Sequence, residues 1–295
     1  MRVVPTLAVV LAAASPVPVA GAPQNLYDWI APAPIVLTGE RVGSADRQVT
    51  VRVRDVLRGE VAPGTTIRVA LRQANRSRDR DLHPAGIQLR PGVSYTLLLE
   101  PGGAGKRGTE PAYELVRGVQ GVRALPAEGA EALVGALATL VAIQAQSDDR
   151  RSWEEIHALL ERGEPLLIET ALDLHVKFRR GDAGLIDTLR PLLEHPAAAI
   201  RERAAGLLGQ ILGRPRDEPG AEVAALRDEL AARARRDPAT PVRLAAVRAL
   251  DALGGEGVLT LLDRIADDDP DQDVRLLAEA LALERRRGAA LAGED

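Results

Sequence analysis

The side chains with the most obvious chemistry are four aspartates at alternate positions between Asp267 and Asp273, in the stretch DDDPDQD. Carboxylate oxygens in such a loop could bind Ca²⁺, which prefers oxygen ligands. In an EF-hand alignment, however, Gln272 would replace the required glycine and Ala278 would replace the bidentate glutamate. We therefore interpret the stretch as a turn whose carboxylates cap the helix that follows it.

The histidines are the other candidates for metal binding or acid–base catalysis, and there are four: His83, His157, His175 and His195. His157 and His175 lie on consecutive predicted helices, where Asp173 or Glu154 could approach them. They support an alternative function, a hydrolase or lyase with its site in a cleft between two domains near His83, His157 or His175. The chain contains no cysteine and no HExxH or GxSxG motif. We therefore predict no catalytic, cofactor-binding or metal-binding residues and a protein that is not an enzyme.

A recurring arginine indicates repeated structure. Arg201, Arg243 and Arg275 each follow a proline, three variable residues and Val or Ile, at intervals of 42 and 32 residues. Apolar residues then recur 4, 7, 8 and 11 positions after the Val or Ile, which is the spacing of one buried helix face. In the last copy the final position is Arg285, which we interpret as the polar end cap of the repeats.

The helical period begins near residue 128. We predict a connecting helix over 128–146 and a helix that begins at Ser152, because Ser152 and Glu155 have the spacing of a capping box. Further helices are predicted over 165–180, 182–194, 197–212, 220–236, 239–253, 256–267 and 271–287.

Over residues 152–288 this pattern resembles HEAT repeats, particularly the short kind named after phycobilisome lyases. The resemblance implies an all-α solenoid that serves as a binding scaffold. We separately predict a disordered tail at 289–295. We expect the three arginines to form a ladder with acids of neighbouring turns. We also expect the inner surface of the solenoid to bind a protein partner. The candidate contact residues are Arg203, Gln210, Arg248 and Asp251.

The first half of the chain follows the period of two that is typical of strands. In RQVTVRVRDVLRG, for example, Val49, Val51 and Val53 alternate with Arg52 and Arg54. Strands of this kind are predicted within 33–43, 47–59, 64–72, 92–103 and 111–118. Five short strands with Gly/Pro turns predict a small antiparallel all-β barrel or sandwich, and we assign a barrel to residues 30–126.

The order of these strands resembles the netrin-like or TIMP-like OB-type domains of exported bacterial proteins. The matching residues are Val53, Val56, Leu57, Gly59, Gly92, Tyr95, Leu97, Leu98 and Leu99. Metalloprotease inhibitors of that family insert an N-terminal cysteine into the target enzyme, and this sequence has none. The resemblance therefore implies an OB-like fold without that inhibitory mechanism.

Charge separates the two halves. Residues 23–127 hold 15 basic and 10 acidic side chains, a net charge of +5, whereas residues 128–295 hold 22 basic and 32 acidic ones, a net charge of −10. Charge attraction could therefore dock the barrel on the solenoid. The basic loop around Arg76 alternates with Asp79 and Asp81, and few stacking aromatics accompany it, so we predict no nucleic-acid partner.

The N-terminus has the order of a secretory signal peptide: Arg2, an apolar run over 3–14, and small residues near 19–22. We predict a signal over 1–22 and a periplasmic or secreted protein with no membrane span after cleavage. The alternative is an uncleaved N-terminal membrane anchor.

Overall fold

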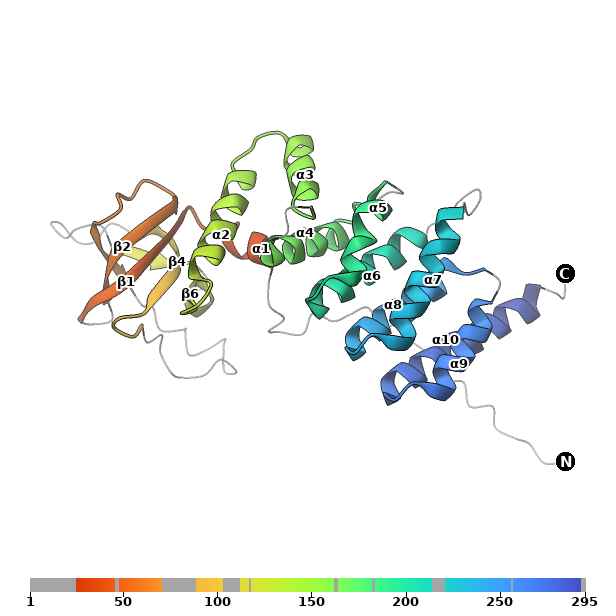
Figure 1. Ribbon diagram of the computed structural model, residues 1–295. Helices are drawn as coiled ribbons and strands as arrows, with labels where there is room; N and C mark the ends of the chain where they lie inside the picture. Colours follow the sequence, from red (N-terminus) through yellow and green to blue (C-terminus); the bar gives the residue numbers. More distant parts are fainter. Residues whose placement is uncertain are drawn as a thin grey trace, which may run out of the picture.

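A computed structural model describes residues 25–45, 48–70, 89–102, 112–116, 118–161, 164–181, 184–213, 221–255 and 257–292. The strands within them are β1 (Ile35–Ala45), β2 (Gln48–Arg58), β3 (Thr66–Ala70), β4 (Ser94–Pro101), β5 (Ala112–Leu115) and β6 (Val122–Ala124). The helices that flank the strands are α1 (Leu26–Ile30) and the 3₁₀ turn η1 (Gly118–Gly121). Figure 1 shows the strands gathered at one end of the molecule and the later helices extending away from them. The predicted signal segment lies outside the described residues.

The later helices form a row of pairs. They are α2 (Ala130–Gln144), α3 (Asp149–Ala158), α4 (Pro165–Lys177), α5 (Leu185–Leu189), η2 (Pro191–Glu194), α6 (Ala198–Leu212), α7 (Ala221–Arg236), α8 (Thr240–Leu253), α9 (Val258–Asp268) and α10 (Gln272–Ala292). We call α4 to α10 the helical array. The predicted layout, a small β-barrel followed by an all-α solenoid, is confirmed.

The strands close into a ring. Their order is β1-β2-β3-β5-β4, β4 pairs back with β1, and β6 adds to the other edge of β4. The pairing of β3 with β5 is parallel and the other pairings are antiparallel. The expectation of an antiparallel arrangement was therefore wrong for this one pair, because the directions of five strands cannot alternate all the way round a closed ring.

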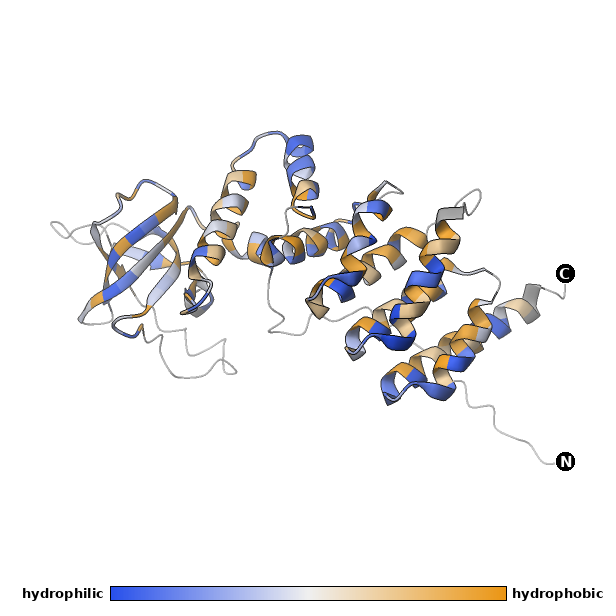
Figure 2. Cartoon of the chain, viewed as in Figure 1, coloured by the Kyte–Doolittle hydropathy of each residue, from blue (hydrophilic) through white to orange (hydrophobic). Residues whose placement is uncertain are grey.

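The barrel interior follows the predicted alternation. Val49, Val51 and Val53 are buried while Arg52 and Arg54 are exposed, and Figure 2 shows this alternation of hydrophobic and hydrophilic residues along β2. The buried interior also contains Leu37, Ile67, Val69, Tyr95, Leu97 and Leu99. Strand β4 departs from alternation because both of its faces are covered: Leu98 points to the helices and joins their hydrophobic core.

Strand β1 must curl tightly to pair with β2 on one side and β4 on the other, and its register against β2 shifts at three places. A Cβ on Gly39 would lie 2.5 Å from Cγ1 of Val51 and 2.8 Å from the backbone oxygen of Arg52. Only glycine fits this approach of the two strands, so Gly39 allows the ring to close.

Helix α1 joins the barrel to the helices. Trp29 Nε1 donates to the Gln120 carbonyl oxygen at 2.6 Å, and Arg58 Nη1 donates to the carbonyl oxygens of Ile30 and Ala33 at 3.1 and 2.9 Å. Lys177 Nζ lies 2.8 Å from the Asp28 carboxylate, which ties α1 to α4. One continuous core runs from barrel residues through α1 and α2 into the array. The joint therefore rests on apolar packing and hydrogen bonds as well as one ion pair.

The helical array stacks through one stripe of each second helix. The predicted stripe is buried in α6 (Ile200, Ala204, Leu207, Leu208, Ile211), and the corresponding residues of α8 and α10 are buried or partly buried. A Cβ on Gly209 of α6 would come within 3.0 Å of the Ala249 Cα of α8. Small side chains thus set the close distance between consecutive second helices.

Three predicted boundaries differ from the structure. The helix expected over 182–194 is divided at Pro191 into α5 and η2, because proline inside a helix removes a hydrogen bond and clashes with the preceding turn. Helix α3 begins at Asp149, since Asp148 rather than Ser152 is its N-cap and accepts hydrogen bonds from the amides of Arg150 and Arg151. Helix α10 continues to Ala292, past the predicted end of the solenoid at residue 288.

Candidate functional site

Buried ion pairs connect consecutive turns of the array. Arg201 at the start of α6 donates from Nε and Nη2 to the two carboxylate oxygens of Asp237, both at 2.8 Å. Its Nη1 donates to the carbonyl oxygens of His195 and Pro196. The Asp237 side chain is fully buried, and its Oδ1 also accepts the Ala239 amide, which begins the turn into α8. One arginine therefore binds its own turn and the next one together.

The following repeat has the same arrangement. Arg243 at the start of α8 donates to Asp269 from Nε at 2.9 Å and from Nη2 at 3.0 Å, while its Nη1 donates to the Asp237 carbonyl oxygen at 3.0 Å. The pairs Arg201–Asp237 and Arg243–Asp269 are called the ladder below. The predicted pairing with acids of neighbouring turns is confirmed for these two arginines. Arg275 continues the pattern only in part, as described below.

The ladder changes the acidity of its members. Burial alone would raise the pKa of Asp237, but hydrogen bonds from Arg201 and the Ala239 amide, together with the charge of Arg201, hold that pKa below its ordinary value. The hydrogen bond to Asp237 raises the pKa of Arg201 in return. Both groups are therefore held in their charged forms, as a bidentate pair requires.

The aspartate-rich turn takes part in the ladder. The Asp269 carboxylate binds Arg243 and accepts the Asp271 amide, and Asp271 accepts the Asp273 amide and the Thr240 hydroxyl. These contacts are those of a capped turn. Within the described residues, no group of three or more acidic or histidine side chains is arranged to hold a metal ion.

The four predicted contact residues divide into two kinds. Arg203 donates from Nε to Asp173 of α4 at 2.7 Å, and Asp251 accepts from Arg285 Nε of α10 at 2.6 Å, so both hold neighbouring helices together. Gln210 on α6 and Arg248 on α8 are exposed. The structure thus leaves Gln210 and Arg248 available for a partner, whereas Arg203 and Asp251 are used within the chain.

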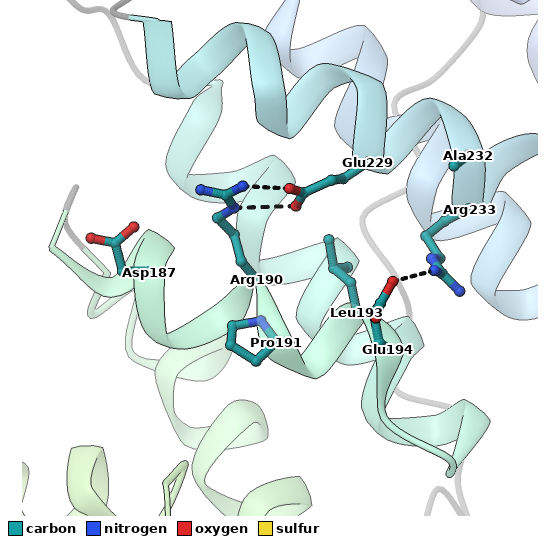
Figure 3. Close-up of a pocket in the computed structure, with 8 residues that line it drawn as sticks. All are labelled: Asp187, Arg190, Pro191, Leu193, Glu194, Glu229, Ala232 and Arg233. Carbon is teal, nitrogen blue, oxygen red and sulfur yellow. Dashed lines mark hydrogen bonds and ion pairs between the residues drawn. The ribbon is translucent and has the colours of Figure 1, made fainter.

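A groove lies in the other layer of the array, between η2 and α7, with a volume of about 510 Å³ (Figure 3). Arg190 binds Glu229 across it through two hydrogen bonds, one of them from Nε at 3.2 Å. Arg233 Nη2 lies 2.8 Å from Glu194. Sequence patterns did not indicate this groove, because its residues come from two segments about 40 positions apart and have no common motif.

The structure brings two of the predicted histidines together. The rings of His157 on α3 and His175 on α4 are 5.9 Å apart, and the His175 ring is 5.5 Å from that of Trp153. The carboxylates expected near them are engaged elsewhere. Asp173 accepts from Arg203, and Glu154 accepts from Arg150. Figure 1 shows α2 between α3 and the barrel, and α2 contacts both α3 and β2.

The two remaining histidines have different positions. His83 lies outside the described residues. His195 occupies the place that Asp237 and Asp269 take in the later turns: its Nδ1 accepts the Ala197 amide at 3.1 Å, as their carboxylates accept the corresponding amides. His195 is therefore the capping residue of the first turn in the ladder.

The interpretation of Arg285 as an end cap was wrong. Its guanidinium turns back toward α8, where it binds the Asp251 carboxylate and carbonyl oxygen. The side of α10 that faces away from α8 carries other residues, Leu276 and Leu283, and both are exposed.

Comparison with protein families matches residues 186–282 to the HEAT repeats. This segment runs from α5 to α10 and contains both pairs of the ladder. Comparisons with curated proteins and with solved structures found no match. None of the described helices has the length and apolar character required to cross a bilayer.

Proposed function

We propose that the protein is an exported, non-enzymatic scaffold that binds another protein on the inner surface of its helical array. The inner surface is the solvent-facing side of the second helices of the pairs, around Gln210 and Arg248. Repeat arrays present such surfaces for extended contacts with a partner, and HEAT repeats support this role here.

The observation that carries the proposal is that some charged and polar residues of α6 and α8 are paired within the chain while others are exposed. Arg201, Arg203, Arg243 and Asp251 are paired within the chain, so they stiffen the array. Arg248 is exposed between these fixed positions, and arginine is enriched at protein interfaces. A rigid surface loses little conformational entropy on binding, which favours affinity.

Two further parts of the proposal rest on the first half of the chain. The closed five-strand ring with a parallel β3–β5 pair supports an OB-type barrel. The signal-like segment at 1–22 supports export to the periplasm or exterior. The proposed partner is a protein rather than a nucleic acid, because three arginines of α6 and α8 are already neutralised by carboxylates.

The test of the inner surface is a matched pair of charge reversals. Arg248→Glu changes an exposed arginine of the inner surface, and Arg264→Glu changes an exposed arginine of α9 in the other layer. The mature chain, tagged at its C-terminus, is used to capture proteins from native extracts. Retention of a specific protein should fall at least about tenfold for Arg248→Glu and change less than about twofold for Arg264→Glu. Equal retention by both variants would refute binding through this surface.

Export has its own test. N-terminal sequencing of the native protein should give a chain that begins after residue 22 in the periplasmic or culture fraction. Recovery of the intact N-terminus in the membrane fraction would instead support the anchored alternative.

A further inference from the structure

The last helix of the array has an exposed apolar side. Leu276 is 52 % exposed and Leu283 is 44 % exposed, and they lie seven residues apart, hence on one side of α10. Arg275 precedes them at the position of the ladder arginines. Arg275, Leu276 and Leu283 are together called the end face.

The end face corresponds to the side by which each second helix contacts the next one. Relative to the Val or Ile that opens each repeat, Leu283 of α10 is equivalent to Gly209 of α6 and Asp251 of α8. Gly209 meets Ala249 of α8, and Asp251 meets Arg285 of α10. Leu283 therefore occupies the position that contacts a following helix.

Leu276 supports the same conclusion. Its equivalent in α8 is Leu244, which is partly buried and packs against the core of the array. A leucine at this position is thus covered within the array but half exposed on α10. The apolar side of α10 matches a stacking surface rather than an end that faces water.

The charge pattern identifies what such a neighbour must carry. Arg275 Nη1 donates to the Asp269 carbonyl oxygen at 2.7 Å, as Arg243 Nη1 donates to the Asp237 carbonyl oxygen. In Arg201 and Arg243 the Nε and Nη2 atoms then bind a carboxylate of the following turn. Among the described residues, Arg275 is paired with no such carboxylate. A neighbour that continued the ladder pattern at Arg275 would therefore carry an acidic side chain beside an apolar helix side.

We propose that the end face binds a helical segment of a partner protein, which packs an apolar side on Leu276 and Leu283 and places an Asp or Glu carboxylate on Arg275. The ladder shows how one arginine and one carboxylate fix the register of adjacent turns, and the partner repeats that geometry between chains. This inference adds a second, separate contact surface to the proposed scaffold.

The turns of the ladder offer no free carboxylate to Arg275 of a second copy of this chain. The turn carboxylates that would fit Arg275 are those of Asp237 and Asp269, and both are buried in pairs of their own. Asp173 of α4, nearer the other end of the array, is also paired within the chain, because it accepts from Arg203 of α6. In the part of the chain that the structure describes, a second copy has no free turn of this kind to offer.

Site-specific photocrosslinking in the cells that naturally make the protein tests the proposal. A photoreactive residue is placed at position 283, at position 248 on the inner surface and at position 264 on the outer layer, each in the full chain. We expect position 283 to capture a protein through a helical segment that carries an acid. Arg275→Glu should reduce that crosslink at least about tenfold, because it replaces attraction by repulsion at a desolvated contact. Replacing the captured acid by arginine should restore the crosslink of Arg275→Glu to within about threefold.

Three results would overturn the proposal. They are a yield at 283 no higher than at 264, a crosslink to a second copy of this chain, and a captured protein whose yield is unaffected by Arg275→Glu. Capture at position 248 is read separately. Failure there concerns the inner surface alone, and failure at position 283 concerns the end face alone. Unchanged thermal unfolding of Arg275→Glu verifies that the variant is folded.

Discussion

The barrel and the helical array bury different polar groups. The buried polar residues of the strands are threonines such as Thr38 and Thr96, whereas the array buries the charged pairs Arg201–Asp237 and Arg243–Asp269. Neighbouring strands are joined by backbone hydrogen bonds across the sheet. A helix makes its backbone hydrogen bonds internally, so only side chains can join it to the helix beside it. The ladder thus joins consecutive repeats of the array, as backbone hydrogen bonds join consecutive strands of the barrel.

The largest expected effect comes from breaking one pair of the ladder. Arg243→Met leaves the buried Asp269 carboxylate without its partner, and we expect it to lower the free energy of unfolding by about 3–5 kcal/mol. The double variant Arg243→Met/Asp269→Leu should lose much less, because it removes both charges. Urea unfolding measures both, with the exposed Arg264→Met as the control, expected within about 0.5 kcal/mol of the wild type. A double variant as unstable as the single one would contradict this reasoning.

Truncating a core side chain should lower the free energy of unfolding by a similar amount in the two regions. The faster hydrogen exchange that results should extend over different parts of the molecule. Leu97→Ala in the barrel and Leu208→Ala in α6 each remove a fully buried side chain, at a cost of about 2–5 kcal/mol. Hydrogen exchange should quicken in all strands together for Leu97→Ala, since the ring closes through every strand. For Leu208→Ala it should quicken mainly in α6 and its neighbours, as nearest-neighbour arrays predict. Equal quickening of barrel and array in both variants would show that the distinction is wrong.

Acid should weaken the array through Asp237. Its pKa is lower in the folded chain than in the unfolded one, so its stabilisation is complete above the unfolded value of about 3.9 and is lost as the pH falls through the folded value. The free energy of unfolding should therefore fall below about pH 4 more steeply for the wild type than for Arg201→Met/Asp237→Leu. Urea unfolding between neutral and acidic pH provides the comparison. Parallel curves would mean that Asp237 does not contribute.

The smallest effect concerns one helix end. Asp148→Ala removes the N-cap of α3 and should cost about 1 kcal/mol, with faster hydrogen exchange confined to α3. Ser152→Ala serves as the control and should change stability by less than about 0.5 kcal/mol, because Ser152 lies inside the helix. A larger loss of stability for Ser152→Ala than for Asp148→Ala would instead support Ser152 as the N-cap, as the capping-box spacing predicted.

Regular repetition made much of this fold predictable. The alternation around Val51 identified β2, and the stripe beginning at Ile200 identified α6, because each pattern repeats with the period of its element. The repeated Pro-x-x-x-Val/Ile-Arg pattern correctly indicated that Arg201 and Arg243 pair with acids of the next turn. Such features depend on neighbours at a constant spacing, which a single sequence records.

Features that depend on distant partners were not predictable in this way. Helix α1 has five residues, too few to show a helical period, and its contacts with Gln120 and Lys177 come from far along the chain. Strand β6 has three residues and is defined by pairing with β4. The inward turn of Arg285 and the exposure of Leu283 depend on how α10 lies against α8. For these features, the sequence identifies the residues themselves but not the residues that they contact.

The joint at α1 has a consequence for the order of events during synthesis. Lys177, which binds Asp28, is 149 residues downstream. At translation rates of about 5–20 residues per second, α1 leaves the ribosome about 7–30 s before that partner is made. During this interval Trp29 and Ile30, buried in the finished protein, have no array to pack against. Helix α1, the first helix that the structure describes, thus reaches its final contacts only after α4 is made, and until then its apolar side chains are accessible to chaperones and proteases.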